Sequence, residues 1–134
     1  MTFDIIWLIG RFFAKVEFAN PAFWRFRFDA GTQICPGCPW RLVRSGAIVL
    51  SSEDHGHPYG HGVPVDAAAR CRPLLIQHTV VQAEVRNDTR DILLYFDNDP
   101  RQEIVPLSSG YESWEIVDPS GRQIVAQGGG NVVT

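Results

Sequence analysis

The chain carries little charge and no excess of basic residues. Only 20% of its 134 residues are charged, and 12 Lys and Arg against 15 Asp and Glu leave a formal net charge of −3. A general nucleic-acid binder needs a concentrated basic face to neutralise phosphates, so we do not expect this class. Because 45% of the residues are apolar, the composition predicts a globular protein with its own core rather than a disordered tail.

Long apolar runs and dense cysteines are also missing. The apolar run at residues 5–9 is far shorter than the ~20 residues that span a bilayer. It has no basic residues ahead of it and no small-residue cleavage site behind it, so we expect no secretory signal. Three cysteines, an odd and sparse set, fit a reducing compartment better than a disulfide framework. These absences predict a cytoplasmic protein without membrane contact.

Alternation of apolar and polar residues predicts a mainly β fold. Strands are expected at residues 13–18, 24–28, 32–34, 40–43, 47–50, 80–85, 91–96, 103–105 and 114–117, with hairpin turns at 45–46 and 118–121. The alanine-rich run at 66–72, which Pro73 follows, predicts the one short helix. We expect a single domain over residues 1–134.

Two stretches of the sequence resemble each other. WRLV at 40–43, SG at 45–46 and IV at 48–49 are echoed by WEIV at 114–117, SG at 120–121 and IV at 124–125. We interpret this as an internal duplication of halves at about 5–62 and 74–130. The pattern favours two similar antiparallel meander units of about four strands each, related by a pseudo-twofold axis and connected by the short helix. A sandwich, a continuous sheet and a barrel all remain open at this point.

The matching tryptophans and the sheet edges have further consequences. Trp40 and Trp114 stand at equivalent positions, and we expect both to anchor the core. A strand left unpaired at a sheet edge would favour pairing with a second copy of the chain, so a homodimer is a possible assembly.

Cysteines and histidines offer a candidate metal site. The candidates are Cys35, Cys38, His55, His57 and His61, because thiolates and neutral imidazoles are the ligands that zinc prefers. The histidines, however, lie in a loop rich in glycine and proline rather than on a helix. The alternative interpretation is a solvated loop and a turn that contains reduced thiols, and we favour it. No cofactor is expected.

The segment 51–55 contains the residue types of acid–base catalysis. Glu53, Asp54 and His55 could act as acid and base, with Ser51 or Ser52 as nucleophile. Neighbouring residues of an extended segment point in opposite directions, so these groups are not expected to converge on one substrate atom. A turn capped by its own Ser and Asp side chains explains the same residues, and we favour it.

A binding groove is the other candidate site. If pairing of the two halves brings their polar loops together, the groove would be lined by Glu53, Asp54, His55, Tyr111 and Glu112. The alternative is that these loops only connect neighbouring strands. The run Gly128-Gly129-Gly130 resembles a phosphate cradle in composition only, since no helix, Lys or Ser/Thr follows at the needed spacing.

Four phrases resemble those of a family of small bacterial proteins of unknown function. They are CPWRLV at 38–43, SSEDHG at 51–56, SSGYESWE at 108–115 and AQGGG at 126–130, and the likeness spans most of the chain. The marks of that family correspond to Tyr111, Glu112, Trp114 and the glycine run. The paired cysteines and additional histidines are not part of its pattern, which counts against the metal site. The resemblance implies a bacterial cytoplasmic β-domain and assigns no activity.

Two functions therefore follow from the sequence. The first is a non-enzymatic binding or interaction module, such as an accessory or immunity-type protein that occupies a partner's surface. The alternative is a small metal-dependent or acid–base enzyme that uses the loop at 53–61. The partner of the binding module, a protein or a small ligand, is left open by the residues.

Overall fold

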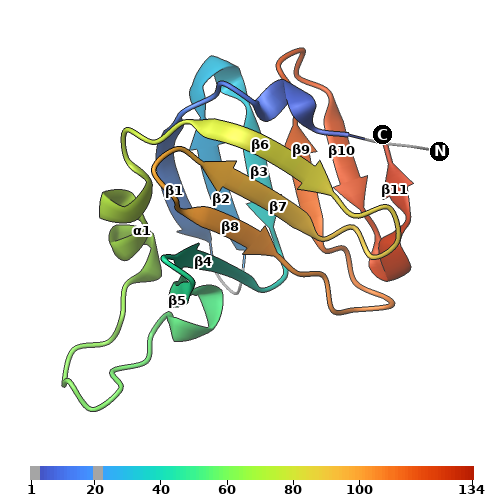
Figure 1. Ribbon diagram of the computed structural model, residues 1–134. Coiled ribbons are helices and arrows are strands. Elements are labelled where there is room, and N and C mark those ends of the chain that lie inside the picture. Colours follow the sequence, from blue (N-terminus) through green and yellow to red (C-terminus); the bar gives the residue numbers. More distant parts are fainter. Residues whose placement is uncertain (1–3, 20–22) are drawn as a thin grey trace.

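Two antiparallel sheets packed face to face form the body of the protein, as Figure 1 shows. The computed structural model describes residues 4–19 and 23–134. The six-stranded sheet has the order β1 (Phe13–Ala19), β2 (Phe23–Phe28), β3 (Gln33–Pro36), β9 (Trp114–Val117), β10 (Gln123–Ala126) and β11 (Val132–Val133). The five-stranded sheet has the order β5 (Ala47–Ser51), β4 (Trp40–Arg44), β8 (Arg101–Ile104), β7 (Ile92–Phe96) and β6 (Val80–Val85). The predicted mainly β, antiparallel class is confirmed.

Each half of the chain contributes strands to both sheets. β1, β2 and β3 pair in sequence order, but the next neighbour of β3 is β9, and β8 in turn pairs with β4. The β4–β5 hairpin of the first half therefore joins the sheet formed by strands of the second half. The β9–β10 hairpin of the second half joins the sheet formed by strands of the first half. This differs from the expected pair of self-contained meanders. The position beside β3 is taken by β9, which pairs with it from Gln33↔Val117 to Pro36↔Trp114, and β4 continues in the other sheet.

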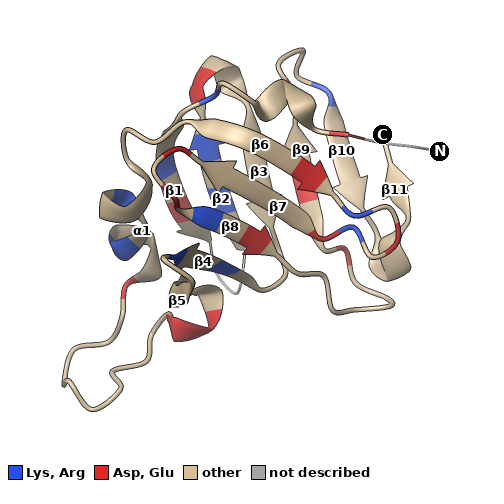
Figure 2. Cartoon of the chain, in the orientation of Figure 1, with Lys and Arg blue, Asp and Glu red and all other residues tan. Residues whose placement is uncertain are grey.

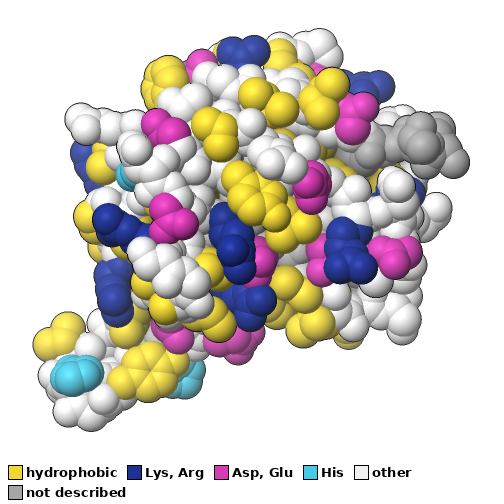
Figure 3. Space-filling model, viewed as in Figure 1, with side chains coloured by type: hydrophobic (Ala, Val, Ile, Leu, Met, Phe, Trp, Pro, Cys, Tyr) yellow, Lys and Arg dark blue, Asp and Glu magenta, His cyan; other side chains and the backbone are white. Residues whose placement is uncertain are grey.

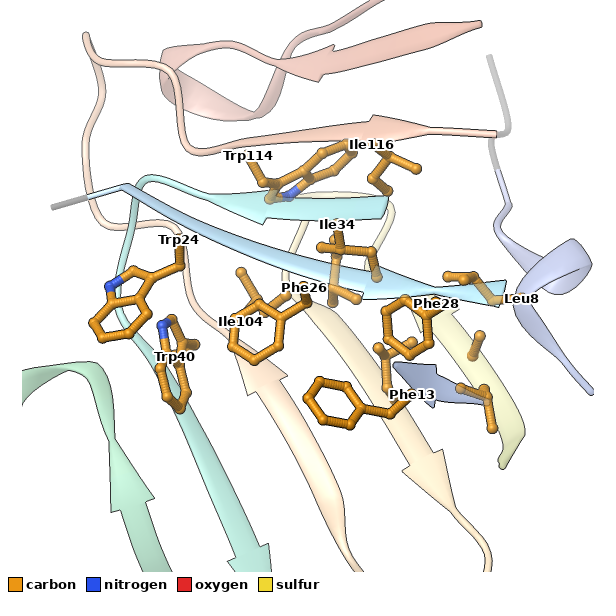
Figure 4. Packing of buried hydrophobic residues seen from close by; sticks show 14 of the residues in the cluster. Leu8, Phe13, Trp24, Phe26, Phe28, Ile34, Trp40, Ile104, Trp114 and Ile116 are labelled. Carbon is orange, nitrogen blue, oxygen red and sulfur yellow. The ribbon is translucent and has the colours of Figure 1, made fainter. Parts of the chain in front are cut away.

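Aromatic side chains fill the space between the sheets. In β2 the burial alternates, so that Trp24, Phe26 and Phe28 point inward, as period-2 geometry requires. Trp40 from the opposite sheet meets the rings of Trp24 and Phe26 edge to face, both with centroids 5.1 Å apart (Figure 4). Trp40 and Trp114 are 1% and 2% exposed, which agrees with the role of core anchors. Such large buried aromatics dominate the apolar area that stabilises a small sandwich.

Among the buried polar residues of the described ranges, which are Thr32, Gln102 and Ser113, the side chain of Gln102 is unusual. Gln102 on β8 is fully buried between its register neighbours Leu42 and Leu94. Neither its amide nitrogen nor its amide oxygen has a hydrogen-bond partner among residues 4–19 and 23–134. A buried amide without partners destabilises the fold, because it loses its hydrogen bonds to water on folding.

A single α-helix covers one open side of the sandwich. Helix α1 (Ala67–Leu75) packs against β1 of one sheet and β5 of the other. The side chain of Asp66 caps it by accepting the N–H of Ala69 at 3.1 Å. The helix was expected to end before Pro73 but continues past it for two residues, because the fully buried Leu75 anchors its last turn in the core. No helix in the described part of the chain is long and apolar enough to cross a membrane.

Short 3₁₀ turns complete the connections. They are η1 (Ile6–Leu8), η2 (Asp29–Gly31), η3 (Ser52–Asp54) and η4 (Gly128–Gly130). On the side opposite α1, η1 packs against β6, and backbone hydrogen bonds from Gly10 to Val80 and from Val80 to Arg11 join the two sheets there. These contacts protect the edges of β1 and β6, which reduces the backbone open to a second chain.

Candidate functional site

Two segments that cross between the sheets run side by side at one end of the sandwich. Residues 37–39 connect β3 to β4, and residues 105–113 connect β8 to β9. Gly37 N–H donates to the Ser113 carbonyl at 2.9 Å, and Val105 N–H donates to the Pro39 carbonyl at 2.8 Å. We call these two segments the crossing pair. The candidate residues that the sequence places in polar loops lie around it.

The polar loop after β5 is a capped turn. Ser51 Oγ accepts the N–H of Glu53 at 3.1 Å, and Asp54 returns the interaction by accepting the N–H of Ser51 at 2.9 Å. The second oxygen of Asp54 accepts the hydroxyl of Tyr59 at 2.8 Å, and this hydrogen bond raises the pKa of Tyr59. Ser52 Oγ bonds both the N–H and the carbonyl of Trp40. Both serines and Asp54 are therefore engaged in holding the turn.

His55 is a structural support of the turn. Its Nδ1 accepts the N–H of Ala67, the first residue of α1, at 3.1 Å. Its ring packs against Phe18 at a centroid distance of 4.5 Å and against Trp24 at 5.3 Å. Because Nδ1 is an acceptor, the neutral ring carries its proton on Nε2, so Nε2 is a donor and cannot serve as a base or a metal ligand in this state.

Beside His55 lies the first of three hollows around the crossing pair, which we call the aromatic hollow. Its volume is about 200 Å³, and its walls are the side chains of Phe18, Trp24, Cys38, Ser52, Glu53 and His55 together with the backbone of residues 37–39. Phe18 and Trp24 pack together with a centroid distance of 4.5 Å. Glu53 belongs to η3, and Figure 2 shows the acidic colour of this turn beneath β5. The hollow thus combines aromatic walls with one carboxylate.

On the other side of residues 37–39 lies the second hollow, which we call the tyrosine hollow. Its volume is about 190 Å³, and its walls are Leu107, Ser108, Tyr111, Glu112 and Ser113 together with the same backbone. Ser108 Oγ holds this segment by accepting the N–H groups of Gly110 and Tyr111 at 3.0 and 2.8 Å. Leu107 and Tyr111 are 75% and 82% exposed. This hollow therefore has an apolar rim that faces solvent.

The largest hollow, of about 560 Å³, lies on the outer face of the five-stranded sheet, the face towards the viewer in Figure 3. It is lined by apolar residues such as Ile48 and Leu93 and by charged residues that include Arg41 and Glu103. Glu103 accepts from Arg41 Nε at 2.5 Å and from Arg101 Nε at 3.1 Å. Burial acts to raise the pKa of Glu103, but the bonds and charges of the two arginines outweigh it and lower the pKa. Glu53 and Pro39 line both this hollow and the aromatic hollow.

The structure brings together four of the five residues expected in a groove, but around the crossing pair and not in one groove. Glu53 and His55 line the aromatic hollow, and Tyr111 and Glu112 line the tyrosine hollow. The backbone of residues 37–39 forms a wall of both hollows. Asp54 lines neither of them, because its carboxylate bonds Ser51 and Tyr59.

The five candidate metal ligands do not assemble. Cys35 is buried beside Arg25 and Gln33, Cys38 lies in the crossing pair, and the rings of His57 and Tyr59 stack at 5.8 Å. His61 is exposed in the segment between η3 and α1, which protrudes as the green loop in Figure 1. Within the described ranges, no group of three or more His, Cys, Asp or Glu side chains lies close enough to hold a metal ion.

The thiols are held in their protonated form. Burial raises the pKa of Cys38 to about 12 and also raises the pKa values of Cys35 and Cys71. A reactive or metal-binding cysteine needs its thiolate, which such burial disfavours. In this structure the Cys-Pro-Gly-Cys segment connects β3 of one sheet to β4 of the other.

Comparison with known proteins gives this chain no relative. No protein-family model, no curated protein and no solved structure matches it. The resemblance to a family of small bacterial proteins stays a prediction for this reason. The functional argument depends on the geometry of the site alone.

Sequence reasoning missed three side chains of this region. Phe18 and Trp24 were assigned only to strands, and Leu107 was not singled out. Trp24 belongs to the regular alternation of β2 and carries no signal that separates a hollow wall from a core residue. A register shift between Phe13 and Lys15 brings Phe18 opposite Trp24, on the same face of the sheet as Phe13, which strict alternation from Phe13 does not predict. Phe18 is 37% exposed.

Proposed function

We propose that this protein is a non-enzymatic binding module whose working surface surrounds the crossing pair. The observation that carries the proposal is the apolar rim of the tyrosine hollow, where Leu107 and Tyr111 are 75% and 82% exposed. Large exposed apolar residues beside hollows are typical of protein–protein interaction sites, and tyrosine is enriched in them. The partner is therefore a protein.

The charge of this surface favours a basic partner. The aromatic and tyrosine hollows together contain two carboxylates, Glu53 and Glu112, and neither Lys nor Arg among their described lining residues. In the described part of the chain, neither carboxylate forms an ion pair or a side-chain hydrogen bond within the protein. Complementary charge on a partner would steer its approach and determine its orientation.

The engagement of the polar loop supports binding over acid–base catalysis. Asp54 bonds Ser51 and Tyr59, and His55 Nδ1 bonds the first N–H of α1. Of the three acid–base candidates, only Glu53 projects into a hollow without such a bond. A general acid and base must both reach the reacting group, and this arrangement offers one such carboxylate only.

Affinity capture from cells that produce the protein tests the proposal. The wild type is compared with Leu107→Ser and with Val63→Ser, a matched control, because both side chains are 75% exposed and Val63 lies on the protruding loop. The specific partner should be retained by wild type and by V63S and lost with L107S. Titration of the purified partner should then show at least about tenfold weaker binding to L107S, the loss typical of an interface anchor. Equal binding of L107S and wild type would contradict the proposal.

A second copy of the chain is the alternative partner. The homodimer expected from unpaired strand edges would use β11, because α1 packs against the edge strands β1 and β5 and η1 packs against β6. Sedimentation velocity over a concentration series separates the two cases. If wild type forms dimers as its concentration rises and L107S stays monomeric, the function of this surface is self-association.

We further propose that the two halves arose by internal duplication. The exchange of hairpins supports it. In one sheet, strands β1, β2 and β3 are followed by the hairpin β9–β10 of the second half. In the other sheet, strands β6, β7 and β8 are followed by the hairpin β4–β5 of the first half. Each hairpin begins with a buried tryptophan on the strand that pairs with the other half. Superposition of residues 13–51 on 80–126 should then need a rotation close to a half turn, and dissimilar backbones would contradict the duplication.

A further inference from the structure

We propose that the aromatic hollow receives an arginine side chain of the partner protein. This inference rests on the proposed binding function and names the chemical group that the site recognises. The recognising groups are the ring of Phe18 and the carboxylate of Glu53. Cys38 and the backbone of residues 37–39 complete the walls of the hollow.

The aromatic wall is rigid and partly open to solvent. Phe18 is 37% exposed, whereas Trp24 beneath it is 3% exposed. The rings of Phe18, Trp24 and His55 contact one another at centroid distances between 4.5 and 5.3 Å. Because His55 is also bonded to the start of α1, this cluster has little freedom to rearrange. A fixed aromatic face attracts a cation and offers apolar contact to the methylene groups that carry it.

Glu53 supplies the charge. It is the one carboxylate among the described residues that line the aromatic hollow, and its side chain is exposed. The two arginines of the neighbouring hollow are already paired, Arg41 with Glu103 at 2.5 Å and Arg86 with Asp88 at 3.6 Å. An incoming cation can therefore pair with Glu53 without displacing an internal ion pair.

The other walls do not compete with this interaction. Ser52 Oγ is engaged with the backbone of Trp40, and Nδ1 of His55 is engaged with Ala67. Burial raises the pKa of Cys38 to about 12, so its thiol is neutral and polarisable at physiological pH. The hollow thus presents one anionic group on an apolar wall.

Arginine fits this combination better than lysine. The planar guanidinium can stack on an aromatic ring and at the same time form a two-pronged hydrogen bond with a carboxylate. It is also less strongly hydrated than an ammonium group, so its transfer to an apolar wall costs less. The volume of about 200 Å³ suits one side chain rather than a larger ligand.

The test is an NMR titration of the whole protein with small probes. N-acetyl-arginine amide is compared with N-acetyl-citrulline amide, which has nearly the same shape but no charge, and with N-acetyl-lysine amide. The arginine probe should shift the amide signals of Gly37, Cys38 and Glu53 along a saturable curve, and the citrulline probe should not. Equal shifts with citrulline, or no shift with arginine, would overturn the inference, and equal binding of lysine would overturn the choice of arginine.

Variants locate the binding to the aromatic hollow. Glu53→Gln should weaken the arginine probe about tenfold, which corresponds to about 1.4 kcal/mol. Phe18→Leu keeps the apolar contact, removes the aromatic face and should weaken the probe as well. Glu84→Gln is the matched control, because Glu84 is an exposed carboxylate on β6 that lines neither hollow, and it should bind the probe like wild type. An equal loss in both Gln variants would refute the site.

The outcome separates this inference from the proposed function. If the probe does not bind but partner capture still depends on Leu107, the arginine site is wrong and the binding module stands. If the probe binds as predicted but no partner depends on Leu107, the proposed function is wrong and the cation site stands.

Discussion

The glycine run at 128–130 supports the crossing pair by close backbone approach, and substitutions in it should show this. A Cβ on Gly128 would lie 2.5 Å from the carbonyl carbon of Gly110 and 2.6 Å from its Cα. Gly110 immediately precedes Tyr111, and Gly129 N–H also donates to the Ser108 carbonyl at 3.1 Å. The run thus holds the segment that carries the apolar rim of the tyrosine hollow.

The three glycines separate two physical effects. Gly128 does not have a positive φ, so Gly128→Ala introduces only the close contact. Gly129 has a φ of +81°, and its added Cβ would meet nothing closer than 3.7 Å, so Gly129→Ala introduces only the left-handed backbone. Gly130 has a φ of +96° and would place a Cβ 2.5 Å from the Asp88 carbonyl oxygen, so Gly130→Ala combines both effects.

The magnitudes follow from these two effects. A left-handed conformation costs an L residue about 1–2 kcal/mol, and overpacking costs about 1–3 kcal/mol. We expect the free energy of unfolding to fall by about 1–2 kcal/mol in G129A, about 1–3 kcal/mol in G128A and about 2–5 kcal/mol in G130A.

Denaturant unfolding, followed by tryptophan fluorescence, ranks the three variants by their free energy of unfolding. The midpoints should fall while the slope m stays constant, and each kcal/mol should lower the melting temperature by about 3–5 °C in a chain of this size. G128A as stable as wild type would refute the close approach of Gly128 and Gly110. G129A less stable than G130A would refute the assignment of the additional contact to Gly130.

Three further substitutions test the core, the turn and the outer face of the second sheet. Gln102→Leu should raise the free energy of unfolding by about 1–3 kcal/mol, because it removes a buried amide without partners. A variant that is less stable than wild type in denaturant unfolding would contradict this. His55→Ala should lower it by about 1–3 kcal/mol through lost ring contacts and the lost hydrogen bond to α1, whereas His57→Ala, a control on the exposed loop, should change little in the same assay. Because the pKa of Glu103 is lowered, its ion pairs stabilise the fold fully at pH values above the ordinary glutamate pKa of about 4.3. This contribution is lost as the pH falls through the lowered pKa. The stability difference between wild type and Glu103→Gln should therefore be largest near neutral pH and shrink in acid, and a difference that does not change with pH would exclude the ionic role.

The sequence predicted part of the residues of the candidate site but not their geometry. The sequence pointed to Glu53, His55, Tyr111 and Glu112, and each of these lines a hollow beside the crossing pair. Asp54 could not be separated from its neighbours, because the choice between capping the turn and facing a hollow depends on the orientation of one short 3₁₀ turn. Phe18 was missed because a bulge between Phe13 and Lys15 brings it onto the same face as Phe13, which strict alternation does not predict.

By itself the sequence determined the local elements. Alternation of apolar and polar side chains placed most strands within a few residues, because the period of two is a property of each strand alone. The glycine and proline positions placed the turns, and Trp40 and Trp114 were identified as core anchors from their equivalent places in the two stretches.

Only the tertiary structure decided which strands lie next to each other. The sequence shows the β4–β5 and β9–β10 hairpins but not that each joins the sheet of the other half, because strand neighbours are chosen by the packing of two distant segments. This exchange brings residues 37–39 beside 105–113, and residues 37–39 line the hollows on either side of them. The surface proposed to bind a partner therefore exists through long-range pairing, which no local pattern records.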